Sequence, residues 1–411
     1  MSPALVLCGV LLAPSAAVGQ ETVRRVSLAE ALEAFAGNSL ELKIARSETA
    51  GLVGMARQSR AYFNPEFSFE RDDLSRNDEK AWEESFLLHQ QVEWPGRTTA
   101  RARAARHTIS AGAARLRADS VALAFDVREA YVRAWFAEEA ESVVQRTASV
   151  IQSVVEDAEV RLEAGDISAY EARRLRLARV EAEQELAETV LRTRAARRNL
   201  GVLIAPGTGM QEVGPSEGPD GVPPMISRET ALAAVDGRPD VAAAASELDA
   251  ARAGVDVAGT NWVPVPSLEL GFRHHHDGFG GAAFGLNFAL PLFDRGSGIR
   301  EEAAAHSSAA AYRLELRRQL ARNDVLAASD RYASNRARLE TAGQGLRTDG
   351  EALLASATAA YAENEMTLLE LLDAAGAFQG AQLSALSFET EAWVSYYDLL
   401  RATGSAPEDE R

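Results

Sequence analysis

The chain has 411 residues, of which 43 are basic and 60 are acidic, and its formal net charge at pH 7 is −17. This balance argues against a nucleic-acid partner, because binding phosphate groups requires a basic surface. It fits a solvated acidic surface or a pore that favours cations. The single cysteine is Cys8, near the N-terminus, so we expect neither disulfides nor thiol chemistry in the mature chain.

The first 19 residues resemble a secretory signal peptide. Residues 4–13 form an apolar run that is too short to span a bilayer as a helix. Ala17-Val18-Gly19 is a small-x-small cleavage site, although no lysine or arginine precedes Arg24. No later stretch reaches about 18 apolar residues, so a membrane-spanning helix is not expected.

The remainder of the chain repeats itself at an offset of about 200 residues. Ser27 opens the first copy and Ser227 opens the second. A duplication of this length predicts two similar units that pack around one axis. We expect a first repeat over 20–205, a proline-rich linker over 206–226, a second repeat over 227–404 and a disordered tail over 405–411.

Each repeat reads as helix, strand, strand, long helix, helix. Ser27 and Glu30 form a capping box at the start of the first helix, and the apolar period later changes from 3.6 to 2. In the first repeat we expect a helix over 27–60, strands over about 62–72 and 84–94, and helices over 97–162 and 167–204. In the second we expect a helix over 227–260, strands over about 265–276 and 283–292, and helices over 297–360 and 367–403.

The predicted strands have the features of a membrane barrel. Each is about 10 residues long, which is enough for a tilted strand to cross a bilayer. Aromatic residues lie at the strand ends, as in the girdles of such barrels: Tyr62, Trp94, Trp262 and Phe293 at one end, Trp82 and Phe279 at the other. A soluble sandwich with these aromatics in its core is the alternative. The helix over 97–162 would be about 100 Å long, which favours a helical tube or coiled coil.

Four strands cannot close a barrel by themselves. Unpaired backbone groups are not tolerated in lipid, and the smallest outer-membrane barrels have about eight strands. The chain is therefore expected to form an oligomer. A dimer would reach eight strands and a trimer twelve.

Several local motifs accompany this arrangement in the order found in one known family. They are Asn64-Pro65-Glu66, the segment 91–97, Arg238-Pro239-Asp240-Val241, the segment 263–268 and the segment 289–296. Together they resemble the TolC-type outer-membrane efflux channels, and the likeness covers nearly all of the mature chain. The first-repeat motifs look most like the heavy-metal branch of that family.

The resemblance implies a mainly α-helical fold with membrane β-structure. As a homotrimer, such a chain forms a 12-stranded β-barrel in the bacterial outer membrane, on a long α-helical barrel that crosses the periplasm. It also implies a passive conduit for substrates, heavy-metal cations in the branch named above. The partners would be a periplasmic adaptor and an inner-membrane pump of the resistance-nodulation-division type.

Two alternatives stay open for the function. The first, within the family, is a multidrug or type I secretion exit duct. The second is a non-conducting periplasmic coiled-coil scaffold, which would not need strands with aromatic ends. An enzyme is not expected, because the sequence contains no phosphate loop, no metal-ligand spacing and no nucleophile motif. For the same reason we expect no cofactor.

Two helix–helix turns are expected to form the periplasmic tips. Gly165 can adopt the left-handed conformation that ends a helix, and Asn364 takes this place in the second turn. Plain hairpin turns without a partner are the alternative. The resemblance implies that the tips dock the adaptor, and the residues proposed for this contact are Gly165, Asp166, Ser168, Asn364 and Thr367.

The resemblance also places a gate beside the second tip. Glu370 and Asp373 lie three residues apart on one helix face, where the family has acidic residues lining the closed pore. Three copies would form a ring that attracts cations. Tyr361 matches a tyrosine that helps to hold the entrance shut, and Glu171 is the weaker counterpart in the first repeat. Met366 replaces the usual basic partner, and solvated helix acids are the alternative.

His274-His275-His276 suggests a metal site, but successive side chains of a strand face opposite sides of the sheet, so the three cannot all bind one ion. His275 is expected to share the lumen face with Glu269 and Arg273, and its two neighbours to point outward. We therefore assign no metal site to this run.

Overall fold

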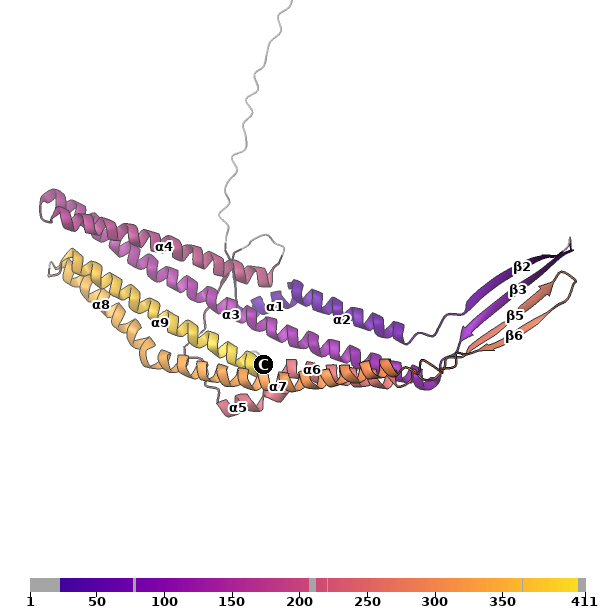
Figure 1. The fold of residues 1–411 in the computed structure, drawn as a ribbon. Coiled ribbons are helices and arrows are strands. Elements are labelled where there is room, and N and C mark those ends of the chain that lie inside the picture. The colour runs from indigo at the N-terminus through magenta and orange to yellow at the C-terminus, as the bar shows by residue number, and fades with distance from the viewer. Residues whose placement is uncertain (1–22, 77–78, 207–211, 220, 364, 406–411) are drawn as a thin grey trace, which may run out of the picture.

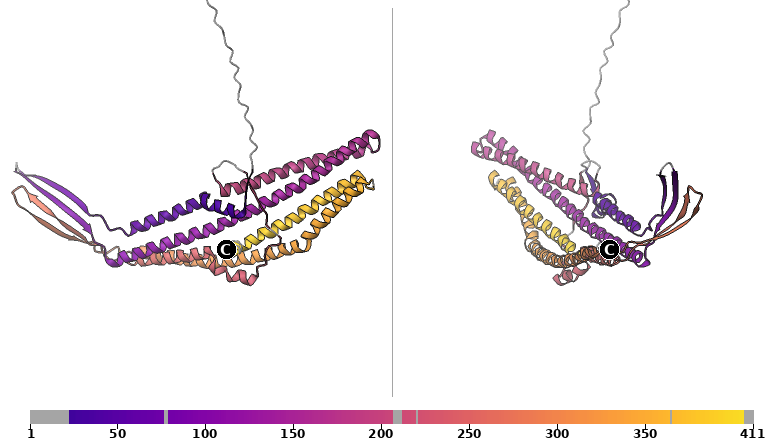
Figure 2. Two further views of the ribbon diagram at one scale, coloured as in Figure 1. Left: turned by 180° about the vertical axis from the view of Figure 1, so that it is seen from behind. Right: turned by 45° about the vertical axis from the view of Figure 1, so that its right-hand side comes forward.

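A computed structural model describes residues 23–76, 79–206, 212–219, 221–363 and 365–405. The predicted signal peptide, Asn364 and almost all of the predicted tail lie outside these residues. The molecule is long, with a β-sheet at one end and two helical hairpin turns at the other (Figure 1). Two further views show the same separation (Figure 2).

The described residues of the first half of the chain form eight elements. The first six are β1 (Arg24–Val26), α1 (Leu28–Asn38), α2 (Leu40–Ser59), β2 (Glu66–Arg76), β3 (Glu79–Gln91) and α3 (Pro95–Ala164). Helix α4 (Ala169–Ile204) and strand β4 (Val213–Pro215) follow. At 70 residues, α3 is about 105 Å long, and α4 and α2 lie beside it one after the other (Figure 1).

The second half repeats this plan. It contains α5 (Arg228–Ala233), η1 (Val235–Gly237), α6 (Pro239–Ala258), β5 (Ser267–His275), β6 (Gly280–Asn287), α7 (Ser297–Arg338), η2 (Leu339–Gly343), α8 (Gln344–Ala362) and α9 (Leu368–Thr403). The segment η2 is a π-helical turn, and the helix axis bends there (Figure 1). Among the helices of the described part of the chain, none combines the length and apolar character needed to cross a bilayer.

The opening helix of each repeat is interrupted, which corrects the single helices expected over 27–60 and 227–260. Ser39 has an extended ψ of 128° and caps α2 by accepting a hydrogen bond from the Leu42 N–H at 3.3 Å. In the second repeat Pro239 occupies the start of α6, where its missing N–H costs no hydrogen bond. Apolar periodicity continues across both breaks, so it does not reveal them.

The strands are also displaced from the predicted ranges. Strand β2 begins at Glu66, because Pro65 cannot donate to a ladder, and it reaches Arg76 rather than residue 72. Strand β3 begins at Glu79 rather than residue 84, and β6 begins at Gly280 rather than residue 283. Polar residues on both faces and the glycines of β6 hide these extensions, since neither produces an alternating pattern.

The four long strands form one antiparallel sheet in the order β2-β3-β5-β6. The two hairpins join through β3 and β5, with Phe86 opposite Phe272 and Leu88 opposite Leu270. One face of the sheet carries exposed apolar side chains from all four strands: Phe67, Phe69, Phe86, Leu88, Leu268, Leu270, Phe272, Phe284 and Leu286. Among the described residues, the outer sides of β2 and β6 have no strand partner.

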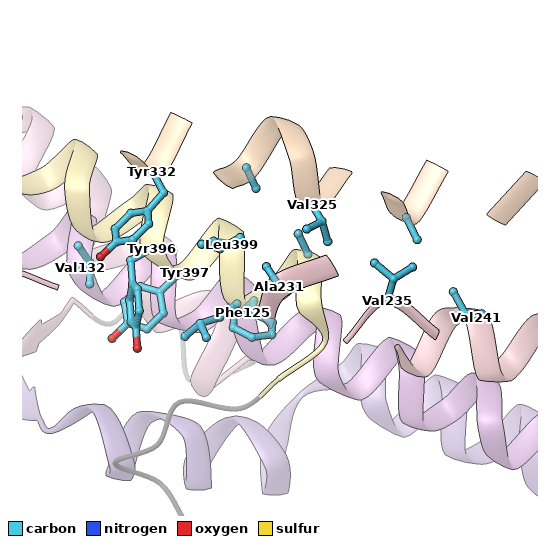
Figure 3. Packing of buried hydrophobic residues seen from close by; sticks show 14 of the residues in the cluster. Phe125, Val132, Ala231, Val235, Val241, Val325, Tyr332, Tyr396, Tyr397 and Leu399 are labelled. Carbon is cyan, nitrogen blue, oxygen red and sulfur yellow. The ribbon is translucent and has the colours of Figure 1, made fainter. Parts of the chain in front are cut away.

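The largest core lies midway along the helices, where α3, α5, α6, α7 and α9 meet. Figure 3 shows Tyr332, Tyr396 and Tyr397 beside Leu399 in this cluster. The hydroxyl of Tyr332 donates to the carbonyl oxygens of Pro223 and Pro224 at 2.9 and 2.6 Å. The linker is thus tied to the core of the second repeat.

Tyr131 holds the linker in the same way on the first-repeat side. Its hydroxyl contacts the carbonyl oxygens of Val26 and Glu217 at 3.2 and 2.8 Å. Close by, β1 pairs in parallel with β4, a strand inside the expected linker over 206–226. The sequence pattern does not indicate this pairing, because both strands have only three residues.

Candidate functional site

The two turns predicted as tips lie next to each other at the end of the molecule away from the sheet (Figure 1). A shared apolar core holds them together and contains residues of α3, α4, α8 and α9: Ile151, Val154, Val155, Ala158, Leu175, Ala357, Leu368, Leu371 and Ala374. A hollow of about 340 Å³ lies between the tips and includes Arg161, Glu171 and Met366 in its wall. The four helix ends therefore form one compact surface.

The first tip is built by a left-handed glycine and a capping serine. Gly165 has φ +82°, and its N–H donates to the Leu162 carbonyl oxygen at 3.1 Å. The N–H of Asp166 donates to the carbonyl oxygen of Arg161 at 2.8 Å, which completes the end of α3. Ser168 then begins α4, and these residues are exposed.

In the second tip a threonine caps the start of α9, as Ser168 caps the start of α4. The N–H groups of Glu363 and Glu365 donate to the carbonyl oxygens of Ala359 and Ala360 at 3.1 and 2.8 Å. Thr367 caps α9. Asn364, proposed for this turn, lies outside the described residues.

Glu171 and Glu370 occupy equivalent positions, each as the third residue of a capping box. Glu171 Oε2 accepts hydrogen bonds from the Ser168 N–H and hydroxyl, both at 2.9 Å. Glu370 Oε2 accepts from the N–H and hydroxyl of Thr367, both at 2.8 Å. The backbone hydrogen bond, followed by the hydroxyl bond, lowers the pKa of each carboxyl group. Both carboxylates are therefore charged at neutral pH, and each stabilises a helix end.

Asp373 lies one turn further along α9 and is exposed, on the same helix as Glu370. The sequence predicts Glu370 and Asp373 as a pair, with Glu171 as its weaker counterpart. The structure gives Glu171 and Glu370 the same capping contacts, a role that this prediction does not include. The sequence S-x-x-E or T-x-x-E before an apolar run is the signal that predicts it.

Tyr361 contacts a residue of the other repeat that sequence reasoning missed. Its hydroxyl donates to Asp157 Oδ2 at 2.9 Å, and the Arg161 guanidinium carbon lies 5.2 Å from its ring centroid. Partial burial, followed by the hydrogen bond to Asp157, raises the pKa of the phenol. Asp157 and Arg161 are one helical turn apart on α3, so that a single face of α3 supplies both contacts.

Met366 packs against the shared tip core. A guanidinium is nevertheless present beside Tyr361, because Arg161 on α3 of the first repeat lies over the tyrosine ring. The signal in the sequence is weak, since Asp157 and Tyr361 are 204 residues apart and only the repeat offset suggests their proximity.

Two of the three contiguous histidines, His274 and His275, lie on opposite faces of the sheet, and His276 follows the end of β5. The His274 ring lies on the apolar face, 5.3 Å from the Trp82 ring. His275 Nε2 is 3.8 Å from Glu83 Oε1 on the polar face. Within the described residues, no group of three or more histidine, cysteine or acidic side chains is placed to hold a metal ion.

The sheet has an exposed apolar face, and it is joined to helices that are much longer than a single globular domain. This combination is the fold of an outer-membrane channel with a helical extension. Residues 232–405 match the family described as "Outer membrane efflux protein". The second repeat is thus similar to this family, and solved outer-membrane channels share the fold of nearly the whole chain. The family is one of channels rather than enzymes.

Individual proteins are similar over most of the chain. The cobalt-zinc-cadmium resistance protein CzcC of Cupriavidus metallidurans is 26% identical over 362 residues, which are 86% of this chain and 84% of CzcC. The structure of the Campylobacter jejuni CmeC outer membrane channel is similar with a TM-score of 0.77 and 17% identity, covering 98% of this chain and 94% of CmeC. The CusC structure gives a TM-score of 0.74 and 18% identity, with coverage of 93% and 94%.

Proposed function

We propose that the chain is the outer-membrane component of a tripartite efflux system and acts as a passive, homotrimeric conduit. The observation that carries this proposal is the four-stranded sheet, with an exposed apolar face and two unpaired edges among the described residues. Lipid requires these edges to be paired, which only further copies of the sheet can achieve. Three copies would make twelve strands around one lumen.

Exposed apolar side chains on the helices support side-by-side association of the same copies. Leu177, Val180 and Leu191 are exposed on α4, and Leu316 and Leu320 are exposed on α7. Such rows are costly in water but suit packing against a neighbouring helix. The strands would then form the barrel, and the helices would form the tube below it.

The tips are the proposed docking surface for a periplasmic adaptor and, with it, an inner-membrane pump of the resistance-nodulation-division type. They are exposed, polar at Asp166, Ser168 and Thr367, and lie at the end farthest from the lipid-facing sheet. A partner that bridges to the inner membrane would reach this end first. Loss of adaptor co-purification in an Asp166→Arg variant, with Glu181→Arg on α4 as the control, tests this surface.

Glu370 and Asp373 are the proposed acidic ring of the closed entrance, and Glu171 contributes charge nearby. Three copies would concentrate carboxylates where the pore narrows and would favour cations. The double variant Glu370→Gln with Asp373→Asn should lower cation selectivity in planar bilayers. Glutamine at residue 370 can still complete the capping box, so the charge is tested separately from the cap. Equal selectivity in this variant and a Glu181→Gln control would contradict the ring.

The proposed cargo is a heavy-metal cation. Support comes from the resemblance to CzcC, which is named for cobalt, zinc and cadmium resistance. A strain without this gene should become sensitive to these ions and regain resistance when the gene is restored. Sensitivity only to organic drugs would support a multidrug exit duct, and a defect only in protein export would support a type I secretion duct.

Membrane fractionation with heat-modifiable gel mobility tests the conduit itself. The proposal expects a trimer in the outer membrane whose mobility changes on boiling and which conducts ions in planar bilayers. A soluble monomer would overturn it. A membrane trimer that never conducts would support the scaffold instead.

A further inference from the structure

The polar face of the sheet contains a histidine–carboxylate pair at the end nearest the helices. His89 on β3 lies directly opposite Glu269 on β5. His89 Nδ1 is 3.5 Å from Glu269 Oε2, with side-chain exposures of 29% and 16%. Alternation places both side chains opposite the apolar face, on the side that would line the lumen.

Two further strands orient this pair. Ser68 Oγ on β2 lies 3.1 Å from His89 Nε2, and Asn287 Nδ2 on β6 donates to Glu269 Oε2 at 3.4 Å. When Nε2–H donates to Ser68, the lone pair of Nδ1 is left toward Glu269. A hydrogen bond from the second ring nitrogen orients a metal-binding imidazole in this way.

The spacing of the two atoms suits one metal ion. Ligands about 2.0–2.1 Å from a tetrahedral zinc ion are separated from each other by about 3.4 Å. The 3.5 Å between His89 Nδ1 and Glu269 Oε2 matches that separation. An imidazole with a carboxylate also suits zinc or cobalt better than magnesium, which prefers oxygen ligands alone.

A second pair on the same face provides a comparison. His275 Nε2 is 3.8 Å from Glu83 Oε1, but Arg273 Nη1 is also 3.8 Å from that oxygen. The guanidinium charge opposes the approach of a metal cation. For Glu269, no lysine or arginine ion pair is found within the part of the chain that the structure describes.

We propose that His89 and Glu269 form a two-ligand site for a divalent transition-metal ion in the lumen, one per protomer, with Ser68 as a positioning residue. The inference rests on the proposed conduit, and it specifies where the proposed metal-ion cargo would bind. Two protein ligands leave the remaining positions to water, so binding is weak and the ion can leave. Conduction needs such a balance between entry and release.

Zinc titration of the full-length protein in detergent tests the site. The background carries His274→Gln, His275→Gln and His276→Gln, so that zinc bound at these histidines is not mistaken for zinc at the proposed site. We expect one zinc ion per protomer in this background and no detectable binding of magnesium. His89→Gln or Glu269→Gln should weaken zinc binding by about tenfold or more. Unchanged zinc affinity in both variants, or no zinc binding in the background, would overturn the proposal.

Ser68→Ala leaves both ligands in place and provides an independent measurement. It should weaken zinc binding by about tenfold through loss of the imidazole orientation. Heat-modifiable mobility should stay the same in all variants, which separates lost binding from lost folding. A protein that conducts potassium but shows no His89-dependent zinc binding would contradict this site and leave the conduit intact. A protein that binds zinc through His89 but never conducts would contradict the conduit alone.

Discussion

The hydroxyl of Tyr361 donates a 2.9 Å hydrogen bond to the carboxylate of Asp157, and this contact joins the α8 end of the second repeat to α3 of the first. Arg161, one turn beyond Asp157, lies with its guanidinium carbon 5.2 Å from the centre of the same ring. The two helical hairpins are thereby held together just above their tips. An entrance that opens by separating the hairpins must break this contact.

Replacing Tyr361 with phenylalanine removes the hydrogen bond and keeps the ring. A hydrogen bond of this kind has a net value of about 0.5–1.5 kcal/mol, so the open population should rise by about two- to tenfold. Single-channel recording in planar bilayers should show more frequent or larger conductance. Tyr312→Phe is the matched control, because Tyr312 on α7 is 77% exposed. Identical recordings for the two variants would contradict a locking role for Tyr361.

The same contact predicts a response to alkaline pH. The pKa of Tyr361 is raised above its ordinary value of 10.0, so the stabilising proton is present below that value. The hydrogen bond should be lost as the pH rises through the raised pKa. Wild-type conductance should therefore increase above about pH 10, and Tyr361→Phe should lack this step. A conductance increase of equal size in Tyr361→Phe would show that another titrating group causes it.

The capping boxes predict fraying at the tips when they are removed. Ser168→Ala and Thr367→Ala should each destabilise the first turn of α4 or α9 by roughly 1 kcal/mol. Hydrogen exchange followed by mass spectrometry should show local exchange about fivefold faster. Ser149→Ala, in the interior of α3, should not accelerate exchange, since alanine favours a helix interior.

Acid should produce the same local fraying. The pKa values of Glu171 and Glu370 are lowered from 4.5, so their stabilising charge is fully present above that pH. It is lost as the pH falls below 4.5 through the lowered pKa values. Protection from exchange, measured relative to the intrinsic exchange rate at each pH, should fall at both tips over this range in the wild type and change less in Glu171→Gln with Glu370→Gln. Equal acid sensitivity would contradict the capping role.

Gly165 and Gly54 predict opposite results for the same substitution. Gly165 has φ +82°, a conformation that costs other residues about 1–2 kcal/mol, so Gly165→Ala should loosen the first tip. Gly54 lies within α2 and has open space for a methyl group, so Gly54→Ala should stabilise its helix by about 0.5–1 kcal/mol. Local hydrogen exchange measures both effects. Faster exchange in both variants, or in neither, would contradict this difference.

Gly271 should be essential for joining the two hairpins of the sheet. A Cβ at residue 271 would lie 2.1 Å from the carbonyl oxygen of Phe86, which is backbone on the adjacent strand. Gly271→Ala should therefore separate β3 from β5 and abolish the proposed heat-modifiable trimer. Gly281→Ala is the control, because a Cβ there meets nothing within 4 Å. Retention of the trimer in Gly271→Ala would show that the strands can shift to admit it.

The sequence alone determined the repeat, the class of each main element and the separation of two sheet faces. These features depend on local spacing: the period changes near Pro65 and Pro266, and His275 shares a face with Glu269 because strand residues alternate. Ser168 with Glu171 and Thr367 with Glu370 were also present as capping signals. Their meaning is local, because the groups involved are at most three residues apart.

Only the tertiary structure decided which of these residues meet. Tyr361 and Asp157 are 204 residues apart, and His89 and Glu269 belong to different hairpins. The pairing of β1 with β4 likewise joins a three-residue segment at the start of the first repeat to one in the linker that follows it. Each contact depends on how helices and strands pack across the repeats, and that packing is fixed by the summed burial of many side chains. Local periodicity carries no information about such a sum.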